Sequence, residues 1–316
     1  MSKLTVGVYL CGYNASETLD QALGSVAAQD CPADRVVCVD DGSTDDTADR
    51  MRSWQQRLPL SVISHEENLG TGATRRHAVE SLDTDVILSI DADDYWFPNH
   101  VSTLLPIWRR FGGIVTPVTL RWVPGVGLAR KSSSARLPIP KDRQLERLLH
   151  SNFIFSGALA ARSDIESAGG YRPLRRREDW DLWLRMLSMG MGVAAPKVPT
   201  MLYRCWEGNR STGASAIQYD IQILNEIMAG QCTPGVRRAA ERALKGRTAR
   251  LAVSDSYDKI ETDGSWAARK AAMGGLHGPA RTSVHALGMI LAPRQTASIW
   301  RSKRYANWRH LSGPLG

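Results

Sequence analysis

Residues 84–99, with the sequence TDVILSIDADDYWFPN, constrain the fold of this chain more than any other stretch. They begin with a short run of mostly β-branched apolar residues at 86–90, which is typical of a strand buried inside a sheet. The run ends abruptly in Asp91, Ala92, Asp93 and Asp94. Because open α/β sheets bind ligands just beyond the carboxyl ends of their strands, the sequence predicts a polar site at this point.

Two interpretations fit this acidic turn. Its three carboxylates repel one another unless cations, solvent or hydrogen bonds offset their charge, and hard divalent cations such as Mg²⁺ and Mn²⁺ prefer oxygen ligands of this kind. A divalent cation shared with a diphosphate would therefore explain the turn. Alternatively, Asp93 or Asp94 caps a helix that begins near Pro98.

Strand and helix patterns alternate through the N-terminal part of the chain. Strand-like runs lie at residues 4–10, 35–39, 60–64 and 86–90, and a helical pattern follows each of them. This alternation predicts an α/β fold with a mostly parallel central sheet flanked by helices. The first turn, CGYNAS, lacks the GxGxxG fingerprint, which argues against a dinucleotide-dependent oxidoreductase.

Asp40 and Asp41 directly follow the predicted strand at 35–39. The turn after them has a structural explanation, because Gly42 permits a tight turn and Ser43 can cap the next helix. That explanation does not require both carboxylates. A carboxylate at a strand end can also accept a hydrogen bond from the imide N–H of uracil or from another base, so we expect one of the pair to read a nucleobase.

Two further segments carry arginines next to helix starts. The glycine-rich segment NLGTGATRR precedes a helix that carries Arg75, an arrangement suited to binding an anion. A second helix is predicted from near Glu178 to Gly190, with Glu178 and Asp179 in its first turn, where the helix dipole favours acidic side chains by about 0.3 to 1 kcal/mol. The dipole explains the acidic pair but not the three arginines at 175–177, which would suit a phosphate-bearing ligand.

The charge of the chain is concentrated in its C-terminal third. The formal net charge is +8, and from residue 201 onward basic residues outnumber acidic ones by nine. This asymmetry fits an anionic partner such as a lipid head group, a phosphorylated acceptor or nucleic acid, or simply a solvated basic surface. Residues 297–311 interleave aromatic and basic side chains, which suits either a membrane interface or a helix packed on the protein.

The sequence also predicts the compartment. It contains no cleavable signal peptide and no run of about 18 apolar residues, so we expect a cytoplasmic protein, with peripheral contact to the inner face of a membrane through the basic C-terminus as an open alternative. The five cysteines are scattered without a CxxC spacing, and we expect free thiols.

Five motifs in order resemble those of family 2 glycosyltransferases with the GT-A fold, and they cover about residues 4–211. They are VYLCGYNASETL, VVCVDDGSTDDT, NLGTGATRR, ILSIDADD and GGYRPLRRREDWDLWLRM. The resemblance implies a GT-A domain over residues 1–205, with a nucleotide-sugar-binding half at 1–115 and an acceptor-side half at 116–205. The remaining residues, 206–316, would form a helical, basic C-terminal extension.

The resemblance also implies roles for individual residues. Asp179 would be the catalytic base, and Asp91 and Asp93 would hold a divalent cation, Mn²⁺ or Mg²⁺, with Asp93 the more direct ligand. The groups expected to bind the nucleotide-sugar are Tyr13, Asp40, Asp41, Arg75, Asp91, Ala92 and Asp93, and those expected beside the sugar or acceptor are Glu178, Trp180 and Trp206.

The chain departs from the family pattern at two places. Cys11 and Gly12 stand where the family has Pro and Thr, and Trp206 stands where some members have a metal-binding His. Metal binding would then rest on Asp93, the phosphates and water.

The expected function is inverting transfer of a sugar from a nucleotide-diphospho-sugar, with UDP before dTDP or GDP, to a hydroxyl of a polysaccharide, a lipid-linked sugar or a small natural product. Nucleic acid is not expected as a substrate, and a homo-oligomer is compatible with the sequence. A catalytically silent sugar-nucleotide-binding or scaffold protein and a sugar-phosphate nucleotidyltransferase are the alternatives.

Overall fold

The computed structural model describes residues 3–123, 127–131, 138–205, 214–262, 264–291, 293 and 296. The chain divides into two compact units. Met1–Leu148 and Asn152–Trp206 form an α/β unit, and Leu149–Ser151 and Glu207–Gly316 form a second unit whose described part is helical.

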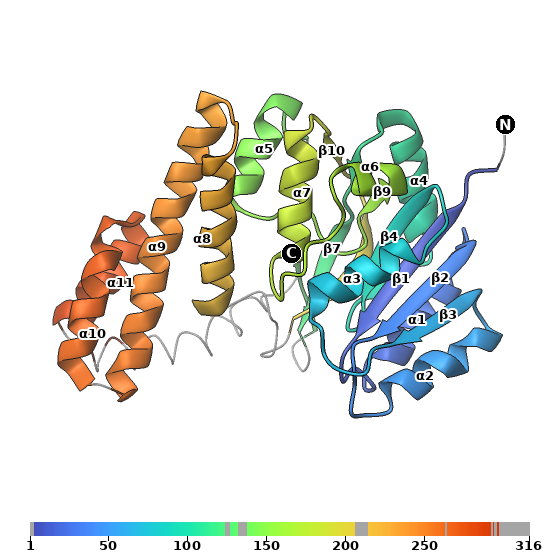
Figure 1. Ribbon diagram of the computed structural model, residues 1–316, viewed down its shortest axis with the longest axis horizontal. Coiled ribbons are helices and arrows are strands. Elements are labelled where there is room, and N and C mark those ends of the chain that lie inside the picture. Colours follow the sequence, from blue (N-terminus) through green and yellow to red (C-terminus); the bar gives the residue numbers. More distant parts are fainter. Residues whose placement is uncertain are drawn as a thin grey trace. The chain divides into compact units, whose positions relative to one another are not determined.

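A seven-stranded sheet forms the centre of the α/β unit, with the strand order β10-β6-β9-β4-β1-β2-β3 (Figure 1). β1 pairs in parallel with β2 and β4, β2 with β3, and β10 with β6, whereas β9 is antiparallel to β4 and β6. The predicted mostly parallel sheet is therefore confirmed. The strands span Val6–Gly12 (β1), Arg35–Asp40 (β2), Leu60–Ser64 (β3), Val86–Asp91 (β4), Ile114–Val115 (β6), Leu159–Ala161 (β9) and Val193–Ala194 (β10).

Helices cover both faces of this sheet, because successive side chains of a buried strand point to opposite faces. On one face, Val8, Leu10 and Leu88 pack in one core with apolar side chains of α1, α2 and α4. On the other face, Tyr9 and Ile87 meet side chains of α6 and α7 around a small cavity. The helices are α1 (Leu19–Ala27), α2 (Thr47–Ser53), the 3-10 helix η1 (Trp54–Gln56), α3 (Thr71–Glu80), α4 (His100–Phe111), α5 (Lys141–His150), α6 (Arg162–Ser167) and α7 (Glu178–Ser188).

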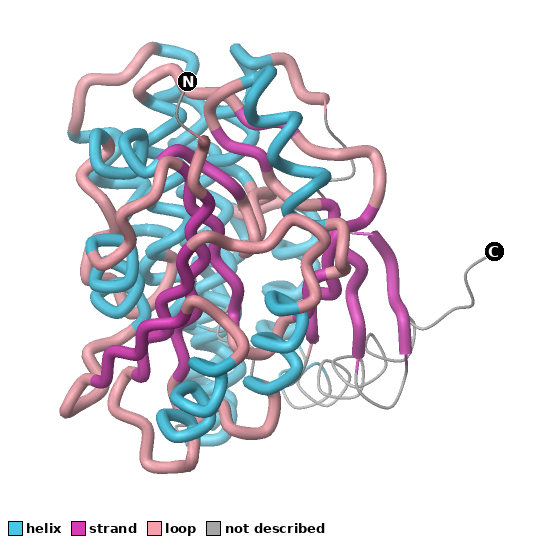
Figure 2. The backbone as a smooth tube through the Cα atoms, turned by 90° about the vertical axis from the view of Figure 1, so that its right-hand side faces the viewer, coloured by secondary structure: helices cyan, strands magenta, loops and turns pink. Residues whose placement is uncertain are grey.

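A second, four-stranded sheet lies beside the central one in the α/β unit, with the order β5-β11-β7-β8. Figure 2 shows the strands of the molecule grouped into these two sets. β11 is parallel to β7 and antiparallel to β5, and β7 pairs with β8 as an antiparallel hairpin. These strands are β5 (Tyr95–Trp96), β7 (Val118–Val123), β8 (Gly127–Lys131) and β11 (Pro199–Arg204).

Helix α7 agrees with the helix predicted from near Glu178 to Gly190. Its apolar positions Trp180, Trp183, Leu184 and Leu187 are all buried, as the helical spacing requires. Two ion pairs brace the helix, because the buried carboxylate of Asp181 contacts the guanidinium groups of Arg172 and Arg185. The first turns of α7 are therefore tied to the loop that precedes the helix.

The described part of the second unit is made of helices that pack through small side chains. Ala268, Ala272 and Ala286 are fully buried between them, and Arg247 forms a buried ion pair with Asp220 at 3.1 Å. Within the described residues no helix is long and apolar enough to cross a membrane. The predicted aromatic and basic segment at 297–311 lies outside them. The helices are α8 (Ala214–Ala229), α9 (Pro234–Thr262), α10 (Gly264–Ala272), the 3-10 helix η3 (Met273–His277) and α11 (Ala280–Leu291).

Candidate active site

The carboxyl ends of β1, β2 and β4 form the edge on which the predicted polar residues lie. Gly12 pairs in register with Asp40, and Cys11 pairs with Asp91. Tyr13 directly follows β1, and its side chain is exposed. The sheet thus brings the first turn, Asp40 and Asp91 to one edge, where parallel α/β sheets bind their ligands.

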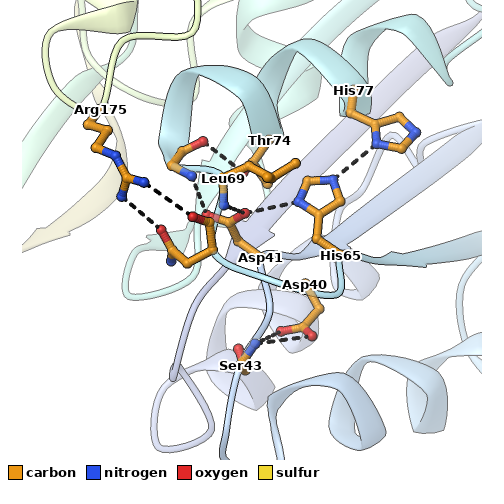
Figure 3. A network of polar contacts seen from close by, with 10 residues as sticks. Asp40, Asp41, Ser43, His65, Leu69, Thr74, His77 and Arg175 are labelled. Carbon is orange, nitrogen blue, oxygen red and sulfur yellow. Dashed lines mark hydrogen bonds and ion pairs between the residues drawn. The ribbon is translucent and has the colours of Figure 1, made fainter.

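The carboxylate of Asp41 is held by three protein donors (Figure 3). The backbone N–H groups of Leu69 and Gly70 donate to it at 3.0 Å each, and Nδ1 of His65 donates at 2.9 Å. A carboxylate offers about four acceptor positions, so Asp41 retains one, on Oδ2. Asp41 therefore orders the loop between β3 and α3 while keeping room for one donor from a ligand.

Asp40 is less fully used by the protein. Its two oxygens each lie 3.4 Å from the backbone nitrogen of Ser43, which is a long contact for a hydrogen bond. Its side chain is nevertheless buried. Of the two carboxylates expected to contact a nucleobase, Asp40 thus has more free acceptor positions. The contact of either carboxylate with a nucleotide stays a prediction.

A pair of stacked histidines extends from Asp41, and the sequence analysis did not single it out. The ring centroids of His65 and His77 are 5.3 Å apart, and the rings are inclined by 11°. Because a carboxylate only accepts, Nδ1 of His65 carries the proton shared with Asp41, and Nε2 of His65 faces Nδ1 of His77 at 3.1 Å. The sequence does show that His65 directly follows one predicted strand and Asp41 another. Because these two strands, β2 and β3, pair in the structure, the position of each residue at a strand end could have pointed to their contact.

Arg75 links the acidic turn to the start of α7. It is buried, and its Nη2 lies 2.7 Å from Oδ1 of Asp91 while its Nε lies 3.3 Å from Oε1 of Glu178. The guanidinium also lies over the ring of Tyr171, 5.9 Å from the centroid. Arg75 was expected near the nucleotide, and the structure adds that its charge is directed at two carboxylates far apart in the sequence.

Gly72 has a packing role in the segment that we interpreted as an anion cradle. A Cβ atom added there would lie 2.1 Å from the carbonyl oxygen of Arg172, and the N–H of Gly72 donates to the carbonyl of Leu174 at 3.0 Å. Only glycine allows α3 to approach residues 172–174 this closely. This contact brings the helix that carries Arg75 against the chain that leads into α7.

The two acidic residues at the start of α7 differ in exposure. Glu178 is buried, and burial raises its pKa to about 7, with Arg75 acting in the opposite direction and Asp179 adding to the rise. Asp179 is only partly buried. Its Oδ1 accepts the N–H of Trp180 at 2.7 Å, and its Oδ2 accepts Nδ2 of Asn152 at 3.0 Å. Asp179 is therefore the carboxylate of this pair that an external group can reach.

Of the three side chains expected beside the sugar or acceptor, the two that the structure describes, Glu178 and Trp180, are buried. Trp180 is 2% exposed, and its indole N–H donates to the carbonyl of Leu148 at 2.8 Å. The structure thus places Trp180 in the core, as its position on the apolar stripe of α7 required, and Glu178 is buried as described above. Trp206 lies outside the described residues.

The acidic turn is tied to the second sheet through Asp94. This carboxylate is 1% exposed and accepts Oγ of Ser156 at 2.7 Å and the N–H of Arg204 at 3.1 Å. Burial, then Asp91 and Asp93, raise its pKa well above its ordinary value. Because α4 begins at His100 and the carboxylate of Asp94 is bonded elsewhere, the interpretation of Asp94 as a helix cap is wrong.

The residues that the structure describes include no group of three or more His, Cys, Asp or Glu side chains that could hold a metal ion by themselves. The turn does supply hard oxygen donors of one sign, and Arg75 offsets only part of that charge. Mg²⁺ commonly binds through one or two carboxylates together with substrate phosphates and water. Asp91 and Asp93 fit a site of that kind.

Sequence comparison matches residues 8–168, about half of the chain, to glycosyl transferase family 2. The amylovoran biosynthesis glycosyltransferase AmsE of Erwinia amylovora is 26% identical over 233 residues, which cover 70% of this chain and 84% of AmsE. The succinoglycan biosynthesis protein ExoU of Rhizobium meliloti is 38% identical over 204 residues, 58% of this chain and 57% of ExoU.

Structure comparison confirms the predicted GT-A fold. TarS residues 1–349 of S. aureus, in complex with UDP-GlcNAc, superpose with a TM-score of 0.66 at 17% identity, over 98% of this chain and 90% of that one. The mannosyltransferase PcManGT of Pyrobaculum calidifontis, in complex with GDP-Man and Mn²⁺, gives a TM-score of 0.62 at 16% identity, over 98% and 84% of the two chains.

Proposed function

The chain belongs to glycosyl transferase family 2, and on this basis we propose that it moves a sugar from a nucleotide-diphospho-sugar to an acceptor hydroxyl with inversion at the anomeric carbon. The donor is a UDP-sugar, the general base is Asp179, and the turn Asp91, Ala92 and Asp93 holds a divalent cation. The observation that carries the proposal is the bridge of Arg75, which joins the strand-end carboxylate of Asp91 to the helix start that presents Asp179.

The exposure of Asp179 supports its role as the base. A sugar hydroxyl is a poor nucleophile, and a positioned carboxylate that takes its proton during attack contributes about 10² to 10⁴ in rate. Glu178 is buried and paired with Arg75, so it is less suited to meet an acceptor. Attack by the hydroxyl on the face opposite the leaving nucleoside diphosphate inverts the anomeric centre and requires no covalent sugar–enzyme intermediate.

The donor assignment is supported by the edge of the sheet that holds Tyr13, Asp40 and Asp41. Tyr13 offers an exposed ring against which a base can stack, and the remaining acceptor positions of the two carboxylates suit the imide N–H of uracil. The similar TarS structure contains UDP-GlcNAc, whereas the similar PcManGT structure contains GDP-Man. We therefore propose UDP as the nucleotide of the donor, in preference to GDP and dTDP.

A divalent cation would be held by Asp93, with Asp91 as a second ligand. Its chemistry when bound is to offset the negative charge that develops on the departing diphosphate, which is worth several kcal/mol. Arg75 competes for the same carboxylate, because it already pairs with Asp91 at 2.7 Å. The similar PcManGT structure, which holds Mn²⁺, favours the same class of ion here.

The acceptor is proposed to be a hydroxyl of a growing polysaccharide or of a lipid-linked sugar. The names of the two relatives, which refer to amylovoran and succinoglycan biosynthesis, support this class. A small natural product is the alternative acceptor. We propose a cytoplasmic location, with contact to a membrane surface through the basic C-terminal region.

A thermal-shift screen with UDP, dTDP, GDP and CMP, each with and without Mn²⁺, tests the donor and metal assignments. A ligand that binds only the folded state, at about 100 times its Kd, adds roughly 2.7 kcal/mol of stability. We expect UDP to give the largest shift, and Mn²⁺ to increase it. If no nucleotide stabilises the protein under either condition, the proposal is wrong.

Asp179→Asn tests the base. We expect this variant to bind UDP like the wild type and to lose transfer, measured as release of UDP from a UDP-sugar in the presence of acceptor. A catalytically silent binding protein would release no UDP above background in either form.

A further inference from the structure

Residues 152–157 lie in the connection between α5 and β9, and the five sequence motifs do not include them. Asn152, the first residue of this segment, donates from Nδ2 to Oδ2 of Asp179 at 3.0 Å. Its Oδ1 accepts the backbone N–H of Ile154 at 3.1 Å. The side chain thus has one structural partner in its own segment and one partner at the proposed base.

The contact with Ile154 fixes which end of the amide faces Asp179. A backbone N–H can only donate, so it must meet the amide oxygen of Asn152, and the amide nitrogen must then point to the carboxylate. The other oxygen of Asp179 accepts the N–H of Trp180 at 2.7 Å. Both carboxylate oxygens are therefore oriented before any acceptor arrives, and each keeps acceptor capacity for an incoming hydroxyl.

The rest of the segment is anchored on both sides. The N–H of Phe155 donates to Oγ1 of Thr116 at 3.1 Å, and Oγ of Ser156 donates to Asp94 at 2.7 Å. Ile154 is 2% exposed. Because these contacts hold the backbone that carries Asn152, its amide is fixed relative to the acidic turn as well as to α7.

We propose that Asn152 is a positioning residue, which holds the carboxylate of Asp179 in the orientation that accepts the proton of the acceptor hydroxyl. The inference rests on the proposed role of Asp179 as the base. The segment that orients the base also contacts the acidic turn at residues 91–94, because Ser156 donates to Asp94. A displacement of the base by about 1 Å is enough to cost about 100-fold in rate, which gives such an orienting contact its value.

Two variants separate positioning from a structural role. Asn152→Ser keeps an oxygen that can accept the N–H of Ile154, since serine replaces asparagine in such turns, but its side chain is too short to reach Asp179. Asn152→Asp is isosteric and also keeps the contact with Ile154, but it sets a second carboxylate about 3 Å from the first. Neither variant removes the turn. A purely structural role would therefore leave Asn152→Ser fully active, whereas the new charge in Asn152→Asp acts on Asp179 in either case.

We expect both variants to lower kcat by about 10- to 100-fold, the loss expected for one hydrogen bond to a charged group. The donor KM and the thermal shift with UDP should stay at wild-type values. In Asn152→Asp the acid limb of the pH–rate profile should also move to higher pH, because two adjacent carboxylates retain a shared proton. In Asn152→Ser the limb should move much less. The rate is measured as release of nucleoside diphosphate with water or mixed oligosaccharides as the hydroxyl nucleophile.

The same assay on Asp179→Asn tests the base role of Asp179 separately from the positioning role of Asn152. If Asp179→Asn is inactive while Asn152→Ser keeps the wild-type kcat, the positioning role is wrong and the base assignment stands. If Asp179→Asn retains wild-type activity, the base assignment itself is wrong. In the double variant Asn152→Ser with Asp179→Asn, we expect no loss beyond that of Asp179→Asn alone, and an additive loss would contradict action through Asp179.

Discussion

Replacing Arg75 by leucine should destabilise the protein by an amount that grows with pH. The guanidinium contacts Glu178, whose side chain is 8% exposed, and Asp91, whose side chain is 37% exposed. Loss of hydrogen bonds to charged groups costs about 1.5 to 3 kcal/mol each, and the Asp91 contact is discounted because solvent screens it. At pH 5 to 6 we therefore expect the Arg75→Leu variant to lose about 2 to 3 kcal/mol of unfolding free energy.

The additional cost at higher pH comes from Glu178. Burial raises its pKa from 4.5 to about 7, and Arg75 limits that rise. Between these two values the folded state binds more protons than the unfolded state, so stability already falls as pH rises through this window. Without Arg75 the pKa of Glu178 rises further. Above pH 7 the variant should thus lose about 1.4 kcal/mol more than the wild type for each pH unit, until Glu178 ionises in the variant as well.

Urea unfolding followed by tryptophan fluorescence at pH 6, 8 and 9 measures this difference. Arg76→Leu is the matched control, because Arg76 lies on the same helix and forms an exposed i,i+4 pair with Glu80 at 2.9 Å. We expect that control to change stability by no more than about 0.5 kcal/mol at any pH. If the loss in Arg75→Leu is the same at pH 6 and pH 9, Glu178 does not titrate against Arg75 and the reasoning is refuted.

Three further predictions follow from the site. His65→Leu should weaken UDP binding by about 10-fold, because Asp41 loses its side-chain donor, whereas His65→Asn should keep most of the affinity. Titration calorimetry measures both variants, and a His65→Leu affinity equal to that of the wild type would contradict the role of His65. Gly72→Ala should destabilise the protein by about 1 to 3 kcal/mol through its clash with Arg172, whereas Gly24→Ala, which meets nothing closer than 3.5 Å, should be neutral or stabilising in the same urea assay. EDTA should abolish most of the transfer and added Mn²⁺ should restore it, and activity that survives EDTA would remove the cation from the proposal.

The fold and the sheet edge could be predicted from local patterns. Buried β-branched runs that end in Asp40 and Asp91 predict parallel strands with their carboxyl ends side by side, and the register of β1 with β2 and β4 agrees. Helix α7 followed from the spacing of its apolar residues. The same spacing also required Trp180 to be buried, so the expectation that it lies beside the acceptor conflicted with the pattern from the start.

The connections across the site could not be predicted in this way. The pairing of Arg75 with Glu178 and of Asn152 with Asp179 joins residues that no periodicity or turn rule relates. The bonds of Asp94 depend on β11 and on residues 152–157, which a local reading assigns to separate elements. Such contacts are set by the tertiary packing of several elements, and no local pattern around Asp94 describes them.

The edges of the seven-stranded sheet bear on solubility. Its outermost strands are β10, with two residues, and β3, with five. An exposed edge strand can pair with another chain through its unpaired backbone N–H and C=O groups, and a longer strand presents more of them. Short edge strands are therefore a common protection against aggregation. The sheet that carries the candidate site therefore offers only short edges as a template for pairing with another chain.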